Sequence, residues 1–153
     1  MAYVRLDKIK NSAHIESIVH EEDLKNGQFL DLGVLHEDLD GEATEVTKTA
    51  EGGAYQALLV SEFLNYEGRA DFDYAAQVTK AGKAGRAYIL EPGNMISVTE
   101  DLINGTIAVG DDVAIGANGL GFKKADTDEV VVGKAIGEDY LANIGELLVV
   151  RFK

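Results

Sequence analysis

The chain of 153 residues contains no cysteine, no tryptophan and a single proline, Pro92. Without cysteine it can form neither a disulfide nor a thiolate nucleophile, and a structural zinc site would lack its usual sulfur ligands. No apolar run approaches the roughly 20 residues that span a bilayer, and no basic-led apolar run opens the chain. We therefore expect no membrane partner and no secretion signal, and the composition suits a reducing compartment.

Positive charge is also scarce, with 14 Lys and Arg against 27 Asp and Glu and a net charge of −13. Such a surface repels nucleic acid, so nucleic acid is not an expected partner. The imbalance is concentrated in residues 14–73, which hold 15 acidic residues against three basic ones. Two short segments are basic instead: residues 1–13, and residues 74–90, whose charged residues are Lys80, Lys83 and Arg86.

Glycine is abundant, and 17 glycines spread along the chain are too many for long helices. Apolar residues come in short runs, including 28–35, 55–60 and 106–110, separated by Asn-Gly, Asp-Gly and Gly-Gly turns. This pattern predicts an all-β protein, a small β-sandwich or β-barrel of at least eight strands forming one domain over residues 1–153. Residues 12–24 fit either a strand or an amphipathic helix. The expected strands lie near 71–78 and at about 86–90, 95–99, 112–116, 129–136 and 146–152.

The segment GANGLG, residues 116–121, raises the possibility of a phosphate-binding loop. Its glycines are not in the Gly-x-Gly-x-x-Gly order, and the polar residues that follow predict a turn and a strand where a phosphate loop needs a helix. Asn118 and Gly119 both tolerate positive φ, which favours a tight hairpin turn. We therefore predict that these glycines shape the backbone and bind no nucleotide.

Catalytic and metal-binding patterns are missing from the sequence. His14, His20 and His36 do not form His-Glu-x-x-His, and no serine lies in Gly-x-Ser-x-Gly. The segment HEDLDGE, residues 36–42, has part of a calcium-loop spacing but lacks its first and closing acidic ligands, which leaves at most a weak surface cation site. The sequence thus predicts a protein that is not an enzyme and has no cofactor and no metal centre.

The segment VGDDVAIGANGLGFKKADTDEVVVGKAIGEDYLANIGELLVVRFK (109–153) resembles the head decoration, or capsid cement, proteins of tailed phages. The segment AHIESIVHEEDLKNGQFLDLGVL (13–35) is similar to the openings of phage and prophage head proteins from Gram-positive hosts. The resemblance implies a β-rich homotrimer, made in the host cytoplasm, on the outer capsid surface of the virion. There it would bind the major capsid protein and staple neighbouring capsomers. The alternative is a phage fibre or a carbohydrate- or host-surface-binding β-module, which exposure of Tyr66, Phe72 and Tyr74 would favour.

The two basic segments are the predicted partner contact in this acidic chain. Residues 1–13 could form an N-terminal arm that adds as a strand to a neighbour's sheet edge, and residues 80–86 a mobile loop. The alternative that stays open is an ordinary first strand and a solvated loop. The candidate partner-binding residues are Tyr3, Val4, Arg5, Leu6, Lys8, Lys10, Lys80, Lys83 and Arg86.

Overall fold

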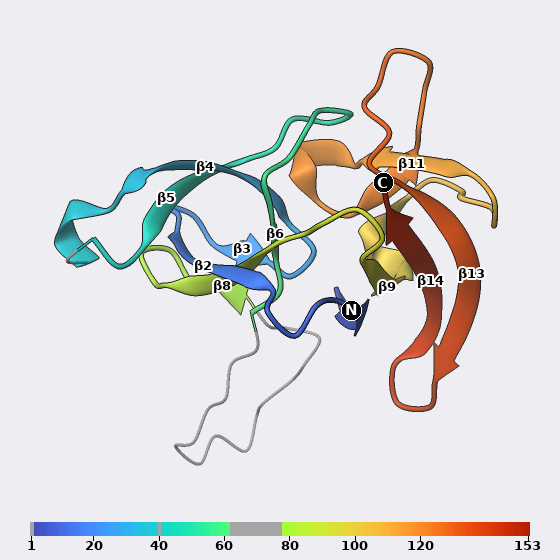
Figure 1. Cartoon of the computed structure of the whole chain (residues 1–153), viewed down its shortest axis with the longest axis horizontal. Helices are drawn as coiled ribbons and strands as arrows, with labels where there is room; N and C mark the ends of the chain where they lie inside the picture. The colour runs from blue at the N-terminus through green and yellow to red at the C-terminus, as the bar shows by residue number, and fades with distance from the viewer. Residues whose placement is uncertain (1, 40, 62–77) are drawn as a thin grey trace.

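The computed structural model describes residues 2–39, 41–61 and 78–153, and these residues form an all-β protein, which confirms the predicted fold class (Figure 1). Helical turns in the described ranges are short 3-10 segments, η1 (Glu37–Leu39), η3 (Glu100–Leu102) and η4 (Ala117–Gly119). The strands are β1 (Val4–Lys8), β2 (His14–Val19), β3 (Leu24–Lys25), β4 (Phe29–Leu35), β5 (Thr44–Lys48), β6 (Ala57–Leu59), β7 (Val78–Thr79), β8 (Gly85–Ile89), β9 (Met95–Thr99), β10 (Ile103–Asn104), β11 (Asp112–Ile115), β12 (Phe122–Lys124), β13 (Gly133–Leu141) and β14 (Gly145–Phe152).

The strands form two main units that lie side by side (Figure 1). A closed five-stranded barrel has the order β2-β5-β4-β6-β8, and a seven-stranded sheet has the order β1-β9-β14-β13-β11-β12-β10. A small ladder of β3 and β7 completes the described pairing. The β4–β5 hairpin and the long, curved β13–β14 hairpin extend at opposite ends of the molecule.

Alternating side chains explain the central strands of the larger sheet. Ile96 and Val98 on β9, and Val150 and Phe152 on β14, face one core and are at most 3% exposed. The opposite side of β9 carries Ser97, which is fully buried as well. β9 is therefore covered on both faces, whereas β14 exposes Arg151 on the face opposite Val150 and Phe152.

The barrel and the sheet share one aromatic core. Phe29 from barrel strand β4 makes an edge-on contact with Phe122 of β12, with ring centroids 5.3 Å apart, and a second one with Tyr55 at 4.8 Å. Phe152 of β14 lies 6.4 Å from the Phe29 ring. A separate apolar cluster fills the barrel interior around Ile18 and Leu30. The shared aromatic cluster means that the two units bury each other's apolar surface.

The predicted turn at Asn118-Gly119 is present, and it also joins the two units. Asn118 (φ 54°) and Gly119 (φ 72°) occupy the positive-φ positions between β11 and β12. The Gly121 N–H donates to the carbonyl oxygen of Gly27 in the barrel at 3.0 Å. A Cβ on Gly121, whose φ is 65°, would lie 2.0 Å from the backbone oxygen of Leu102. Glycine is required here because backbone approaches backbone.

Four predicted strands, at 86–90, 95–99, 112–116 and 146–152, are confirmed to within one residue as β8, β9, β11 and β14. The extended alternative for residues 12–24 is also correct, because β2 and β3 occupy them. The strand expected near 71–78 lies outside the described residues except for Val78 in β7.

Two apolar runs are not strands where the sequence pattern places them. The prediction over 129–136 is wrong in its first half, because β13 begins at Gly133. Glu129 instead accepts a hydrogen bond from Lys123 Nζ at 2.7 Å, and the Val130 N–H donates to the Gly52 carbonyl. The apolar run 106–110 ends in a turn where Gly110 has a φ of 98°.

Candidate partner-binding surface

Residues 4–8 of the predicted arm form β1, the first strand of the larger sheet. It pairs antiparallel with β9, with Val4 opposite Val98 and Leu6 opposite Ile96. Val4 is 6% exposed, and Leu6 packs against the same core. Because β1 is the last strand of its sheet, its outer edge has no strand partner in the described chain. The segment is thus an ordinary first strand, and its free edge is the part that could receive a strand from a neighbour.

Arg5 is held by acidic groups of its own chain. It forms an ion pair with Asp7, and its Nη2 donates to Asp139 Oδ2 on β13 at 2.6 Å and to Ser97 Oγ at 3.2 Å. The hydrogen bond that Arg5 donates to Asp139 raises the pKa of Arg5, and the same bond lowers the pKa of Asp139. Arg5 therefore ties β1 to β13 and is not a free cation for a partner.

A small cavity of about 260 Å³ lies between β1 and β8. It brings four predicted residues of the first basic segment together with Arg86 of the second, although the two segments are about 80 residues apart. Arg86 is exposed, and the described chain supplies it with no ion-pair partner. The guanidinium of Arg86 can bind a carboxylate, and the rings of Tyr3 and Tyr88 can pack against an apolar side chain of a partner. The lining residues are Tyr3, Val4, Arg5, Leu6, Val60, Arg86 and Tyr88.

The remaining predicted residues lie outside this cavity. Lys10 forms an ion pair with Glu91 at 2.5 Å, and Lys80 forms one with Asp23 at 2.8 Å. The hydrogen bond from Lys80 lowers the pKa of Asp23. Lys8 and Lys83 are exposed, and the described residues give them no ionic partner.

Other site chemistry is sparse in the described ranges. No group of three or more His, Asp or Glu side chains is arranged to hold a metal ion among residues 2–39, 41–61 and 78–153. The same ranges contain no helix that is long and apolar enough to cross a bilayer. Tyr66, Phe72 and Tyr74, whose exposure was to favour a carbohydrate-binding module, lie outside the described residues.

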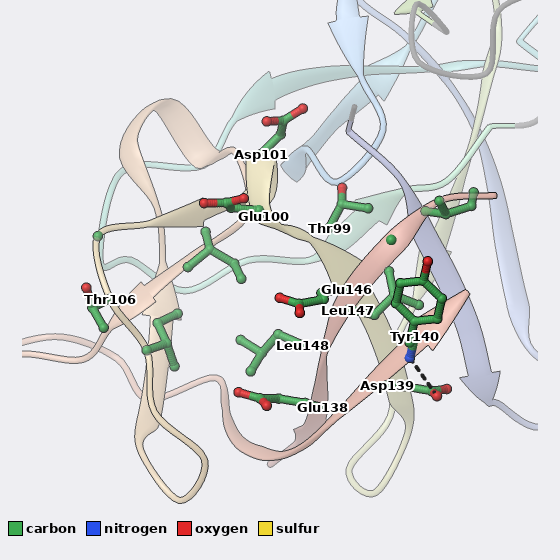
Figure 2. Close-up of a pocket in the computed structure, with 15 residues that line it drawn as sticks. Thr99, Glu100, Asp101, Thr106, Glu138, Asp139, Tyr140, Glu146, Leu147 and Leu148 are labelled. Carbon is green, nitrogen blue, oxygen red and sulfur yellow. Dashed lines mark hydrogen bonds between the residues drawn. The ribbon is translucent and has the colours of Figure 1, made fainter. Parts of the chain in front are cut away.

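Sequence reasoning missed a larger feature at the β13–β14 hairpin. An open groove of about 1030 Å³ lies between this hairpin and the chain that runs from Thr99 through η3 to Ile107 (Figure 2). Glu138, Tyr140 and Glu146 line its hairpin side, and Glu100 and Thr106 its other side. The one local signal of this groove in the sequence was the segment GEDYL, residues 137–141, which places acidic and aromatic residues within an otherwise apolar strand region.

The fold has a counterpart among solved structures. The N-terminal base of the head fibre protein gp8.5 of bacteriophage phi29 superposes with a TM-score of 0.60 at 14% sequence identity. The superposition covers 92% of this chain and 94% of the phage chain. No protein-family profile matches the sequence. No curated protein sequence is significantly similar to it. The likeness extends over nearly the whole fold, including both the barrel and the sheet.

Proposed function

We propose that the protein is a structural component of a tailed-phage virion, without enzymatic activity, that sits on the outer surface of the head. The observation that carries the proposal is the whole-chain similarity in fold to the base of a phage head fibre. The sequence supports it independently, because residues 109–153 resemble phage head decoration proteins and residues 13–35 resemble the openings of phage head proteins. A net charge of −13 suits a position outside the shell, away from the packaged genome.

In this proposal the partner is the major capsid protein, and the contact is the free edge of β1 with the cavity beside it. A capsid segment that adds to this edge would gain backbone hydrogen bonds, with the cavity near Arg86 accepting a carboxylate side chain. The protein acts as a homotrimer, so three modest contacts combine through their high effective concentration. The contacted capsid surface is acidic, and binding weakens as salt screens the exposed basic groups.

The role on the head has two versions. A decoration protein staples neighbouring capsomers and so stabilises the shell. A fibre base attaches to the shell and carries further structure outward, and the similarity to the phi29 fibre base favours this second version. Both versions require stoichiometric binding to assembled heads.

The test is cosedimentation of the purified protein with undecorated heads of the phage that encodes it. We expect saturable binding that falls as salt rises, and weaker binding by Lys8→Glu than by Glu37→Lys, a control of opposite charge change on an exposed residue of η1. Failure to cosediment at any salt concentration would remove the proposal. Heating decorated and bare heads then separates the two versions: a cement raises the temperature at which heads break, and a fibre base leaves it unchanged.

A further inference from the structure

The groove beside the β13–β14 hairpin gathers carboxylates from separate parts of the chain. Glu100 comes from η3, Glu138 from β13 and Glu146 from β14, and all three are exposed and turn toward the same space (Figure 2). The described chain gives none of the three an ion-pair partner. Asp139 differs from them, because Arg5 already occupies it. The groove therefore has unneutralised negative charge in the isolated chain.

The groove also has apolar walls, which distinguish it from a solvated acidic face. Ile103, Ile107 and Leu148 line it and belong to the edge of the main core. Tyr140, on the hairpin, is 64% exposed and is one of the most exposed large apolar side chains in the described residues. Such a surface suits an occupant that carries cationic groups on a backbone with small side chains.

The chain itself has a segment of this kind in KAGKAGR, residues 80–86. Lys83 and Arg86 are exposed and lack ion-pair partners in the described residues. The turn is ordered by hydrogen bonds from the Lys83 N–H to the Lys80 carbonyl and from the Gly82 N–H to the His20 carbonyl, each 2.9 Å. A Cβ built on Gly82 meets no atom within 4 Å, so the turn protrudes into open space. The prediction of a mobile loop over residues 80–86 is therefore wrong, because the turn is held by these hydrogen bonds and residues 85–86 belong to β8. A protruding turn that is already ordered loses little entropy on docking.

The geometry points to a head-to-tail contact in which the basic turn 80–86 of one copy enters the acidic groove of the next. His20 and Asp23 bind the turn beside the barrel, whereas the groove belongs to the larger sheet, so we assign the contact to two copies of the chain. Turn and groove are different surfaces, so the contact is heterologous and closes into a ring when the rotation between copies allows it. The inference deepens the proposed homotrimer by naming its interface, and it leaves the β1 edge for the capsid. Arg86 also lines the cavity beside β1, so the single reversal Lys83→Glu is the variant that reports on this interface without changing the capsid contact.

The test uses purified protein and charge reversal on both sides of the contact. The double variant Glu138→Lys with Glu146→Lys reverses the charge of the groove, and the double variant Lys83→Glu with Arg86→Glu reverses the charge of the turn. The quadruple variant, called the fourfold variant below, carries all four substitutions. Glu37→Lys with Asp38→Lys is the matched control, because it makes the same charge change as the groove reversal at exposed residues remote in sequence from both surfaces. Sedimentation velocity measures the assembly state, and circular dichroism checks the fold of each variant.

We expect the wild type and the control to form the same closed oligomer. Each twofold reversal should raise the dissociation constant by about 100-fold or more, because like charges then face each other. The fourfold variant should regain the oligomer, since opposite charges again meet. A monomeric wild type at high concentration, an effect of the control equal to that of the groove reversal, or no recovery in the fourfold variant would each overturn the inference. Cosedimentation with heads is a separate measurement, so a wild-type protein that is monomeric in solution but still binds heads would reject this interface and leave the proposed binding to heads standing.

Discussion

Replacing Phe29 by alanine should destabilise the barrel and the sheet together. Phe29 is fully buried, and its ring contacts Tyr55 at 4.8 Å and Phe122 at 5.3 Å between centroids. Removal of such a ring from a packed core costs about 3–5 kcal/mol, including the cavity that remains. Since a domain of this kind has a free energy of unfolding of about 5–15 kcal/mol, the loss is a large part of the total.

Urea unfolding followed by circular dichroism measures the effect of this substitution. With a slope of about 2 kcal/mol per molar urea, the midpoint should fall by about 2 M. Hydrogen exchange then measures the stability of the two units separately, from the protection of backbone amides of β5 in the barrel and of β14 in the sheet. Both sets should lose protection to the same extent, because Phe29 lies in the core that they share.

Tyr140→Ala is the control for the Phe29 substitution. Its side chain is 64% exposed, so the free energy of unfolding should change by no more than about 0.5 kcal/mol. A double-mutant cycle between Phe29 and Phe122 should give a coupling of about 0.5–1.5 kcal/mol. If Phe29→Ala lowers protection in β5 and leaves β14 unchanged, the two units unfold independently and the shared core is not what holds them together.

Three further predictions concern backbone crowding and pH. Gly121→Ala should destabilise the protein far more than Gly82→Ala in thermal unfolding: both glycines have positive φ, worth about 1–2 kcal/mol of strain for alanine, but only at Gly121 would the new Cβ lie 2.0 Å from a backbone oxygen. Equal losses would contradict the crowding. On the acidic side, hydrogen bonding from Lys123 lowers the pKa of Glu129, so this contribution to stability is complete above the unfolded pKa, near 4.5, and is lost as pH falls below it. Lys123→Met should therefore flatten the acid limb of a stability–pH profile, and an unchanged limb would show that the pair contributes nothing. On the alkaline side, burial raises the pKa of Tyr55, so the folded state resists its ionisation and stability should fall once pH passes the unfolded value of about 10. Tyr55→Phe should reduce that fall, measured by urea unfolding across the alkaline range, and an equally steep fall in the variant would assign it to other groups.

Local features of this fold could be predicted from the sequence, and long-range ones could not. The turn at Asn118-Gly119 depends on two adjacent residues that tolerate positive φ, and β9 and β14 depend on short apolar runs between turn residues. The place of β1 depends instead on pairing with β9, about 90 residues along the chain. Because a strand with one free edge has the same alternation as a detached arm, the sequence pattern left both alternatives open.

The candidate sites show the same limit. The cavity beside β1 joins Arg86 to Tyr3 only because β1 and β8 come together in space, and the pairing of β14 with β9 brings Glu146 near Glu100. Charge counts along the chain correctly located exposed basic groups such as Lys83. They could not show that Arg5 would be neutralised by Asp139, since that ion pair crosses the curved sheet.

The glycine contact between barrel and sheet has a consequence for how relatives of this protein are recognised. A buried valine can become isoleucine or leucine with modest repacking, so two chains at 14% identity can have this same fold. Gly27 and Gly121 have less freedom, because Gly27 has a φ of 87° and a Cβ on Gly121 would lie 2.0 Å from the backbone oxygen of Leu102. We expect divergent relatives to retain this pair of glycines, which are about ninety positions apart, even where most of the surrounding amino-acid sequence has changed. A comparison weighted toward such positions should detect kinship that overall similarity no longer reveals.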